Sequence, residues 1–306
     1  MTYPPPELSV VEGIARAYFK DFIHLERTAT GASTYVYRTL TSGGVRYIRL
    51  LPEGTSFAPE VLAHRILLAL GVPVPEVLGW EARNQATGLS VMVIKAMPGR
   101  SVQEEPPAGG TGPVLMQAGR QLARLHQVPV AGFGFIDRAH GDALRGEYPD
   151  FGSFWDAHLA ADLEALDGYP FSARQRADIA AHLARARPLL DTPRAALAHG
   201  DFDISHIFHQ NGRLTGFIDL GEIRGCSPLF DLGTFCFADA TPGRIAYEHL
   251  LTGYSQVHPL RRDDRYAAAC MGLFQIVRFL GKKAGAPAAA FWRGQALRQL
   301  DYLSGL

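Results

Sequence analysis

The chain has 306 residues, of which 47% are hydrophobic, so it is long enough to bury a sizeable core in about two domains or lobes. Its 30 basic and 30 acidic residues cancel, which argues against a general nucleic-acid binder or a polybasic membrane anchor. Three scattered cysteines exclude a disulfide framework and a paired-cysteine zinc site. The first ten residues lack a signal-peptide pattern and no apolar run could span a membrane, so we expect a cytoplasmic protein.

Residues 1–99 are predicted to form a strand-rich lobe. Two runs rich in Val, Tyr, Ile and Thr flank Ser42-Gly43-Gly44, a pattern typical of a β-hairpin. In the second run every other residue shares one face, which places Arg49 among apolar side chains, where it needs a partner. A helix is predicted from Pro59 to Leu70 with Glu60 in its first turn. A further apolar strand ends at Pro98-Gly99, where we place the lobe boundary.

Residues 100–306 are predicted to form a mainly helical lobe. Ser172 is a candidate helix cap, and amphipathic patterns recur over residues 244–257, 263–283 and 288–304. One hairpin that turns on Asn211-Gly212 is expected to be the only interruption. The fold class is therefore α+β, with a small antiparallel-sheet lobe followed by a mainly helical lobe.

The segment HGDFDISH, from His199 to His206, concentrates ionisable side chains, and a short apolar run then delivers Asp219. A phosphoryl-transfer enzyme needs one carboxylate to orient the attacking hydroxyl, a ligand further along the same loop, and a second carboxylate to hold metal against the nucleotide phosphates. Asp201, His206 and Asp219 supply that set in that order.

The motifs HGD, GFIDLGE and SPLFDL, preceded by GASTYVYR and YIRLLP, occur in one order along the chain. In this respect the chain resembles the aminoglycoside phosphotransferase family, the small-molecule relatives of protein kinases, including hygromycin- and macrolide-type members. The resemblance implies a protein-kinase-like bilobal fold, with a nucleotide-binding lobe over residues 1–99 and a catalytic and substrate-binding lobe over residues 100–306. It also implies transfer of the γ-phosphoryl group of ATP or GTP to a hydroxyl of a small molecule, with aminoglycoside and macrolide antibiotics among the expected acceptors.

The resemblance assigns roles in the second lobe. Asp201 would be the catalytic carboxylate, and Asp219 and His206 would hold Mg²⁺. Because imidazole suits softer metals and His206 stands where kinases carry asparagine, Mn²⁺ is an alternative. Asp231 is expected to brace the catalytic loop, and His199 to anchor backbone carbonyls.

In the first lobe the resemblance places Arg49 on the nucleotide phosphates, paired with Glu60. Arginine replaces the lysine that many relatives carry, which keeps the charge and adds a planar fork. Ser33 and Thr34 would lie in the phosphate-covering loop. The backbone from Ile94 to Ala96 would dock the adenine or guanine edge.

Alternative interpretations remain open at this point. His199, Asp201, Asp203, His206 and His209 could instead form the metal cluster of a hydrolase. A nucleotide-binding pseudokinase and a kinase of an ordinary hydroxylated metabolite are further alternatives. The sequence gives no reason to expect a nucleic-acid or membrane partner.

Three smaller expectations concern the surroundings of these motifs. We expect His209 to be exposed to water. Glu222 either faces a substrate amine or is solvated. The aromatic residues from Phe151 to Trp155 are expected to pack a helix rather than to form a platform for a sugar.

Overall fold

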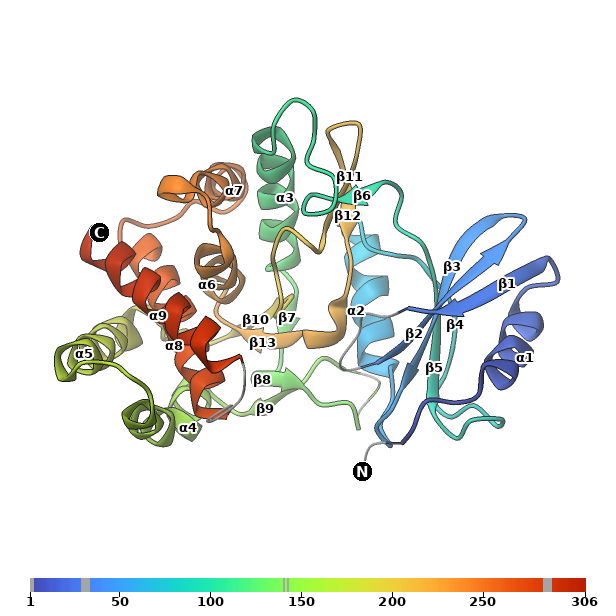
Figure 1. Ribbon diagram of the computed structural model, residues 1–306, viewed down its shortest axis with the longest axis horizontal. Helices are drawn as coiled ribbons and strands as arrows, with labels where there is room; N and C mark the ends of the chain where they lie inside the picture. The colour runs from blue at the N-terminus through green and yellow to red at the C-terminus, as the bar shows by residue number, and fades with distance from the viewer. Residues whose placement is uncertain (1–2, 29–33, 140, 142, 283–287) are drawn as a thin grey trace.

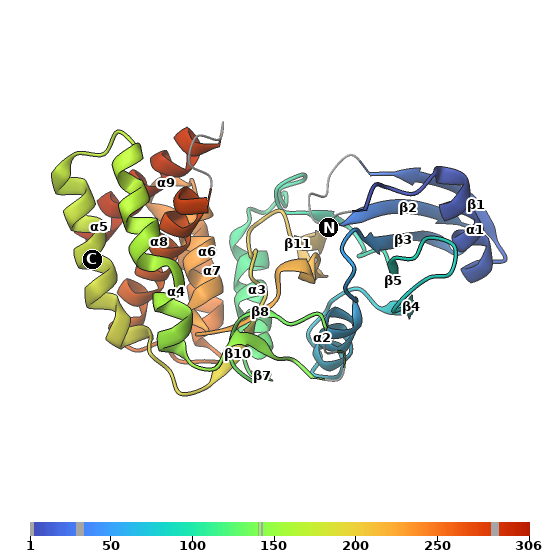
Figure 2. The same ribbon diagram turned by 90° about the horizontal axis from the view of Figure 1, so that it is seen from below.

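The computed structural model describes residues 3–28, 34–139, 141, 143–282 and 288–306. A sheet-rich part at the N-terminal end lies beside a larger helix-rich part, as two views of the chain show (Figure 1, Figure 2). The prediction of an α+β fold with an antiparallel sheet before a mainly helical region is confirmed. Within the described residues, no helix combines the length and apolar character that crossing a membrane would take.

The N-terminal part is built on one antiparallel sheet in the order β1-β2-β3-β5-β4. The predicted hairpin is present as β2 and β3, and it turns at Gly44, whose φ of 106° favours glycine. The elements of this part are α1 (Leu8–Tyr18), β1 (Phe22–Arg27), β2 (Tyr35–Thr41), β3 (Gly44–Leu51), α2 (Ala58–Ala69), β4 (Val77–Glu81) and β5 (Ser90–Lys95).

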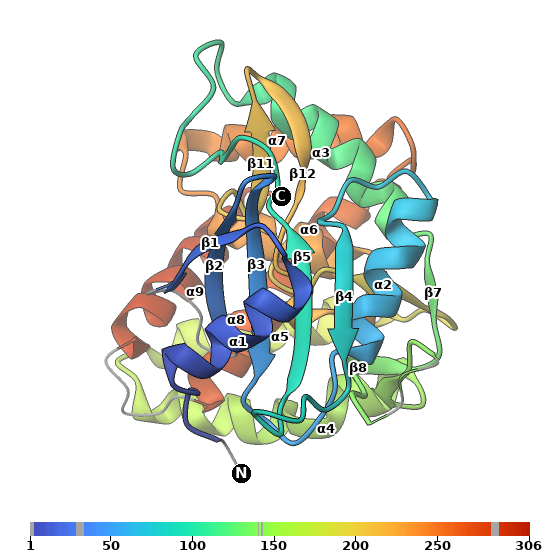
Figure 3. The same cartoon turned by 90° about the vertical axis from the view of Figure 1, so that its right-hand side faces the viewer.

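The two faces of this sheet bury different helices. Helix α1 lies across one face (Figure 3), where Val11 and Ile14 pack against Ile48 and other strand residues. The opposite face packs against α2 through a small cluster of Leu51, Phe57, Val61, Met92 and Ile94. Because side chains alternate along β3, Arg49 is on the α2 side, as the sequence pattern predicted.

The C-terminal part contains the helices that make the main core. Ser172 caps α5 with a complete capping box, in which Gln175 returns the hydrogen bond, so the predicted cap is confirmed. The helical elements are α3 (Gly112–Leu125), α4 (Phe151–Glu164), η1 (Ala165–Gly168), α5 (Ala173–Leu190), η2 (Leu220–Glu222), α6 (Leu229–Ala238), η3 (Pro242–Arg244), α7 (Ile245–Ser255), α8 (Asp264–Lys282) and α9 (Ala289–Ser304).

Short strands interrupt these helices more often than predicted. The hairpin on Asn211-Gly212 is present, but a second sheet of the order β7-β10-β13-β8-β9 is also formed, so the expectation of a single interruption is wrong. Strands of two to five residues carry too little periodicity to be recognised alone. They are β6 (Arg100–Ser101), β7 (Pro129–Val130), β8 (Phe133–Ile136), β9 (Gly146–Tyr148), β10 (Ala195–Ala198), β11 (Ile207–Gln210), β12 (Arg213–Phe217) and β13 (Arg224–Cys226).

Helices α3 and α7 touch backbone to backbone. A Cβ on Gly119 would lie 2.1 Å from the carbonyl oxygen of Leu250, and a Cβ on Gly253 would lie 1.9 Å from that of Met116. Each helix therefore presents a glycine to the backbone of the other. Glycine costs about 1 kcal/mol relative to alanine inside a helix, so the close crossing is obtained at the expense of helix propensity.

Candidate active site

The loop that follows β10 is held in shape by a glycine. Gly200 has a φ of 88°, and a Cβ there would lie 1.9 Å from the carbonyl oxygen of Glu222. Only glycine fits that approach, so the HGD motif needs its middle residue for steric reasons. The loop then presents Asp201, whose side chain is about half exposed at 51%.

Asp231, on α6, fixes the start of this loop. Its carboxylate is fully buried and accepts hydrogen bonds from the backbone N–H groups of His199 (2.7 Å) and Gly200 (2.8 Å). The ring of His126 contacts the same carboxylate at 2.9 Å and contacts the Tyr254 hydroxyl through its other nitrogen. Burial works to raise the pKa of Asp231, but the His126 hydrogen bond and the backbone donors outweigh it and hold that pKa below its usual value. The prediction that Asp231 braces the loop is confirmed.

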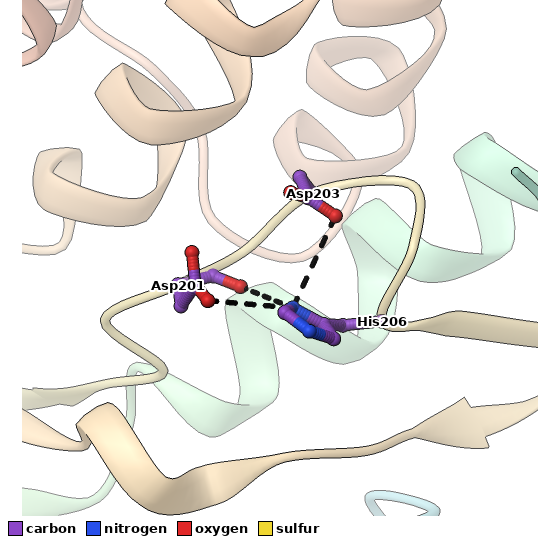
Figure 4. A group of neighbouring side chains, drawn as sticks. All are labelled: Asp201, Asp203 and His206. Carbon is purple, nitrogen blue, oxygen red and sulfur yellow. Dashed lines mark hydrogen bonds and ion pairs between the residues drawn. The ribbon is translucent and has the colours of Figure 1, made fainter. Parts of the chain in front are cut away.

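His206 also turns back onto the loop. Its Nδ1 lies 2.7 Å from the carbonyl oxygen of Asp201, and 3.9 Å from a carboxylate oxygen of each of Asp201 and Asp203 (Figure 4). A carbonyl oxygen only accepts hydrogen bonds, so Nδ1 carries the proton and Nε2 of the neutral ring keeps a free lone pair. Nε2 is the ring atom that can bind a metal.

The five residues of the hydrolase interpretation do not form one cluster. Asp201, Asp203 and His206 can bring ligand atoms within 4.8 Å of one another, but Asp203 accepts the backbone N–H of Ser205 at 2.7 Å, as in an ordinary turn. His199 directs Nε2 at the carbonyl oxygen of Ile218 (2.9 Å), which confirms its expected anchoring role.

His209 lies on β11 and directs Nε2 at the carbonyl oxygen of Glu105, 2.7 Å away. Its side chain is buried, so the prediction that His209 is exposed is wrong. The physical reason is that β11 pairs with β6 on one edge and is covered by the segment that follows β6.

Asp219 lies between β12 and η2 in an unusual backbone conformation. Its φ and ψ of 61° and 65° are left-handed, which costs a non-glycine residue about 1–2 kcal/mol. Its carboxylate is about half exposed, and Oδ1 lies 3.4 Å from Nη2 of Arg49. Burial works to raise the pKa of Asp219, but the Arg49 guanidinium, the two imidazoles of His206 and His199 and the Gly221 N–H together outweigh it, so this pKa lies below its usual value.

Arg49 joins this carboxylate to the N-terminal sheet. Its Nη1 donates to Glu60 Oε1, and both side chains are buried, with 6% and 4% exposed. The guanidinium also lies over the ring of Phe57, with 5.4 Å to its centre. The predicted Arg49–Glu60 pair is therefore confirmed, and the structure adds Asp219 as a second partner.

The remaining predicted residues of the N-terminal part are less informative. Thr34 is buried at the start of β2, whereas Ser33 lies outside the described residues. Ile94 pairs with both β3 and β4, and the N–H of Ala96 donates to the carbonyl oxygen of Val45 at 3.3 Å. Nucleotide contact by these residues remains a prediction.

A cavity of about 610 Å³ opens beside the two acidic residues of the motif, and both Asp201 and Asp219 line it. The carboxylates that the sequence placed far apart therefore border one space. The rest of the wall includes aromatic and basic side chains: Phe135, Tyr148, Phe154, Phe230, Phe274, Phe279, Arg224, Arg278 and Lys282.

Comparison of the sequence with models of known protein families identifies the family of this chain. Residues 24–268 match the profile of the phosphotransferase enzyme family named APH. The chain belongs to this family. No curated protein sequence matches this phosphotransferase closely enough to count as a relative.

Solved structures show how widely the fold of this phosphotransferase is shared. A thermostable variant of the aminoglycoside phosphotransferase APH(4)-Ia, in a ternary complex with ADP and hygromycin B, is 18% identical and superposes with a TM-score of 0.69 over 95% of this chain and 98% of that one. The macrolide 2'-phosphotransferase MphH from Brachybacterium faecium gives 17% identity and a TM-score of 0.61 over 96% and 98%. A candidate fructosamine-3-kinase from Thermobifida fusca is 18% identical and superposes with a TM-score of 0.65 over 98% of this chain and 100% of that one. These likenesses establish the fold.

The residues around Asp219 fit a divalent cation. Asp219 offers a half-exposed carboxylate whose pKa is held low, and His206 offers Nε2 because its Nδ1 is engaged by a carbonyl. One oxygen and one imidazole nitrogen suit Mn²⁺ at least as well as Mg²⁺, which prefers oxygen ligands.

Proposed function

We propose that this phosphotransferase transfers the γ-phosphoryl group of ATP or GTP to a hydroxyl group of a small molecule. The observation that carries the proposal is the position of Arg49, whose guanidinium contacts Glu60 on α2 and Asp219 at the end of β12. Asp219 and Asp201 line one cavity, and this supports the roles that we propose for Arg49 as the phosphate-binding cation, Asp219 as the metal ligand and Asp201 as the base.

In the proposed mechanism Asp201 accepts the proton of the acceptor hydroxyl as its oxygen attacks the γ-phosphorus. A new P–O bond forms while the bond to the bridging oxygen breaks, and the nucleoside diphosphate leaves. A bound Mg²⁺ or Mn²⁺ would supply charge neutralisation at the phosphates. Asp219 and His206 would hold that cation, and Arg49, paired with Glu60, would bind the phosphates together with Thr34.

We assign nucleotide binding to residues 1–99 and acceptor binding to residues 100–306. The backbone from Ile94 to Ala96 would receive the base. Aminoglycosides and macrolides are candidate acceptors, because similar folds are named for those substrates. A metabolite kinase is the alternative, which the likeness to a candidate fructosamine-3-kinase supports.

The test is nucleoside-diphosphate release with each nucleotide and with Mg²⁺ or Mn²⁺, over panels of aminoglycosides, macrolides and hydroxylated metabolites. Asp201→Asn should reduce turnover by about 10²- to 10⁴-fold, the range for general acid–base groups, and should retain nucleotide affinity. Asp219→Asn should instead weaken binding of the metal–nucleotide complex. Wild-type turnover in both variants, or turnover that survives chelation of all divalent metal, would refute the assignment.

A further inference from the structure

The cavity beside Asp201 has a basic end. Arg224 on β13, and Arg278 and Lys282 on α8, line its wall. The acidic residues of that wall, apart from Asp201 and Asp219, are Glu147 and Glu222. The described wall therefore carries more basic than acidic side chains once the two residues of the proposed reaction centre are set aside.

Arg224 is already occupied by the protein. It donates to the Glu222 carboxylate at 3.2 Å and to the carbonyl oxygens of Glu222 (3.1 Å) and Gly200 (3.4 Å). Its guanidinium lies over the rings of Phe135 and Phe230, 4.2 and 4.6 Å from their centres. Arg224 therefore neutralises Glu222 and ties it to the catalytic loop, which removes Glu222 as a free partner for a substrate amine.

The two basic residues of α8, Arg278 and Lys282, have hydrogen-bond donors that no described residue uses. Arg278 contacts Asp162 through Nη1 alone, at 2.9 and 3.2 Å, so its Nη2 has no partner among the described residues. Lys282 forms no ion pair within the described chain, and its Nζ lies 5.9 Å from the centre of the Phe135 ring. Burial, and then the charges of Arg278 and Arg224, lower the pKa of Lys282, so the three basic groups lie close enough to affect one another.

Aromatic rings line much of the remaining cavity wall. Phe154 and Phe274 lie 5.8 Å apart, and Trp155 stacks on Phe274 at 4.2 Å. The expectation that Phe151 and Trp155 pack the helix is confirmed because both are buried, but Phe154 and Trp155 also border the cavity. Such a wall suits an apolar, flat body rather than a heavily hydrated one.

We infer that the acceptor is a hydroxylated molecule with an apolar, ring-sized body and an anionic group, carboxylate or phosphate, that Lys282 binds with help from Arg278. This inference rests on the proposed kinase activity. Its hydroxyl lies at Asp201, its anion lies at Lys282, and its apolar body contacts the aromatic rings of the wall. A polycationic acceptor is disfavoured, because its amines would face the cations of Lys282 and Arg278. Of the two other acidic residues of the wall, Glu222 is paired with Arg224 and Glu147 accepts the N–H of Phe135.

The test uses matched probes with one hydroxyl and one ring. They are para-hydroxymethyl benzoate, the corresponding carboxamide, the corresponding benzylamine and para-hydroxymethyl phenyl phosphate. Binding of each probe is measured by ligand-observed NMR in the presence of ADP, and turnover by release of nucleoside diphosphate. The benzoate and phosphate arms separate the two sources of the anion. Lys282→Glu is compared with Lys20→Glu, which makes the same charge change at an exposed turn outside the cavity wall.

We expect wild type and Lys20→Glu to bind at least one anionic probe about tenfold or more tightly than the amine, which corresponds to about 1.4 kcal/mol. Lys282→Glu should lose or reverse that preference with an unchanged melting temperature. Equal or tighter binding of the amine by wild type, a preference unaltered in Lys282→Glu, or no binding of any probe at millimolar concentration would overturn the inference.

Three further outcomes separate this inference from the proposed function. A raised nucleotide KM in Lys282→Glu, with the anion preference intact, would assign Lys282 to the nucleotide and overturn the inference alone. Absence of nucleotide binding by wild type would defeat the proposed function itself. Nucleotide turnover that depends on Asp201, without any anion preference, would leave the kinase and reject the acceptor class.

Discussion

Breaking the Arg49–Glu60 pair from one side should cost far more stability than removing both charges. In Arg49→Met the Glu60 carboxylate stays buried, 4% exposed, and the nearest cation candidate is His64 at 4.0 Å. Burial lowers the pKa of His64 to about 4, so that ring is neutral at pH 7 and does not compensate the charge. An uncompensated buried charge costs about 3–5 kcal/mol, which is the expected loss in the free energy of unfolding.

The double variant Arg49→Met/Glu60→Leu should recover most of that loss. The pair borders the apolar cluster that contains Phe57 and Val61, and well-packed apolar side chains often replace a buried ion pair at little cost. Urea unfolding of the wild type, both single variants and the double variant measures the coupling energy. Activity should not recover, because the double variant still lacks the cation that contacts Asp219.

Arg49→Lys separates the effect of the positive charge at this position from the effect of the forked shape of the guanidinium. Lysine keeps the positive charge, but a single ammonium group lacks the fork that lets Nη1 contact Glu60 while Nη2 contacts Asp219. We expect a smaller stability loss than in Arg49→Met, together with a clear loss of kcat/KM for the nucleotide. The reasoning is refuted if Arg49→Met costs less than about 1 kcal/mol, the scale of an exposed pair, or if the double variant is no more stable than the single one.

Three further predictions concern the supporting structure. The pKa of His64 is lowered from 6.5 to about 4, so as pH falls the unfolded chain takes up a proton on this ring before the folded chain does. The contribution of the neutral ring to the free energy of unfolding is complete above pH 6.5, and about 3 kcal/mol of it is lost as pH falls to 4. In His64→Asn, unfolding curves should show a weaker dependence of stability on pH over this range. Gly119→Ala should lower the free energy of unfolding by about 1–3 kcal/mol through overpacking. The control Gly294→Ala in α9, where a Cβ would meet only the end of Arg298 at 3.8 Å, should raise it by up to about 1 kcal/mol. Equal effects of the two substitutions would contradict the close backbone contact between α3 and α7. His126→Phe removes one donor from the Asp231 carboxylate, so kcat should fall while the nucleotide KM stays constant; a change in the nucleotide KM alone would argue against this positioning role.

The parts of the fold that could be predicted are those with local signals. The β2–β3 hairpin follows from a glycine turn between strand formers, and the Ser172 cap from a serine before a helical pattern. The convergence of Asp201 and Asp219 on one cavity could be predicted because both belong to motifs that lie close together in the sequence. The Arg49–Glu60 pair followed from an arginine on an apolar strand face, which needs a partner.

The parts that could not be predicted depend on contacts between remote segments. His209 is buried because β11 pairs with Arg100–Ser101, more than a hundred residues earlier, and nothing near His209 signals that pairing. The basic end of the cavity combines Arg224 with Lys282 across the ring of Phe135, and each looks like an ordinary polar residue in its own segment. Chemistry carried by one loop can be recognised from sequence, whereas a wall assembled from several elements cannot.

The reciprocal glycine contact between α3 and α7 connects these two helices to the loop that carries Asp201. Tyr254 directly follows Gly253, and its hydroxyl contacts the ring of His126, the residue that ends α3. The other nitrogen of that ring contacts the Asp231 carboxylate, which accepts the N–H of Gly200. A substitution that pushes α3 and α7 apart would lengthen the contacts of His126 with Tyr254 and Asp231, and would weaken the support of the loop at Gly200. A genetic screen for loss of activity should therefore return positions in these two helices that touch neither substrate, and temperature-sensitive alleles should concentrate there.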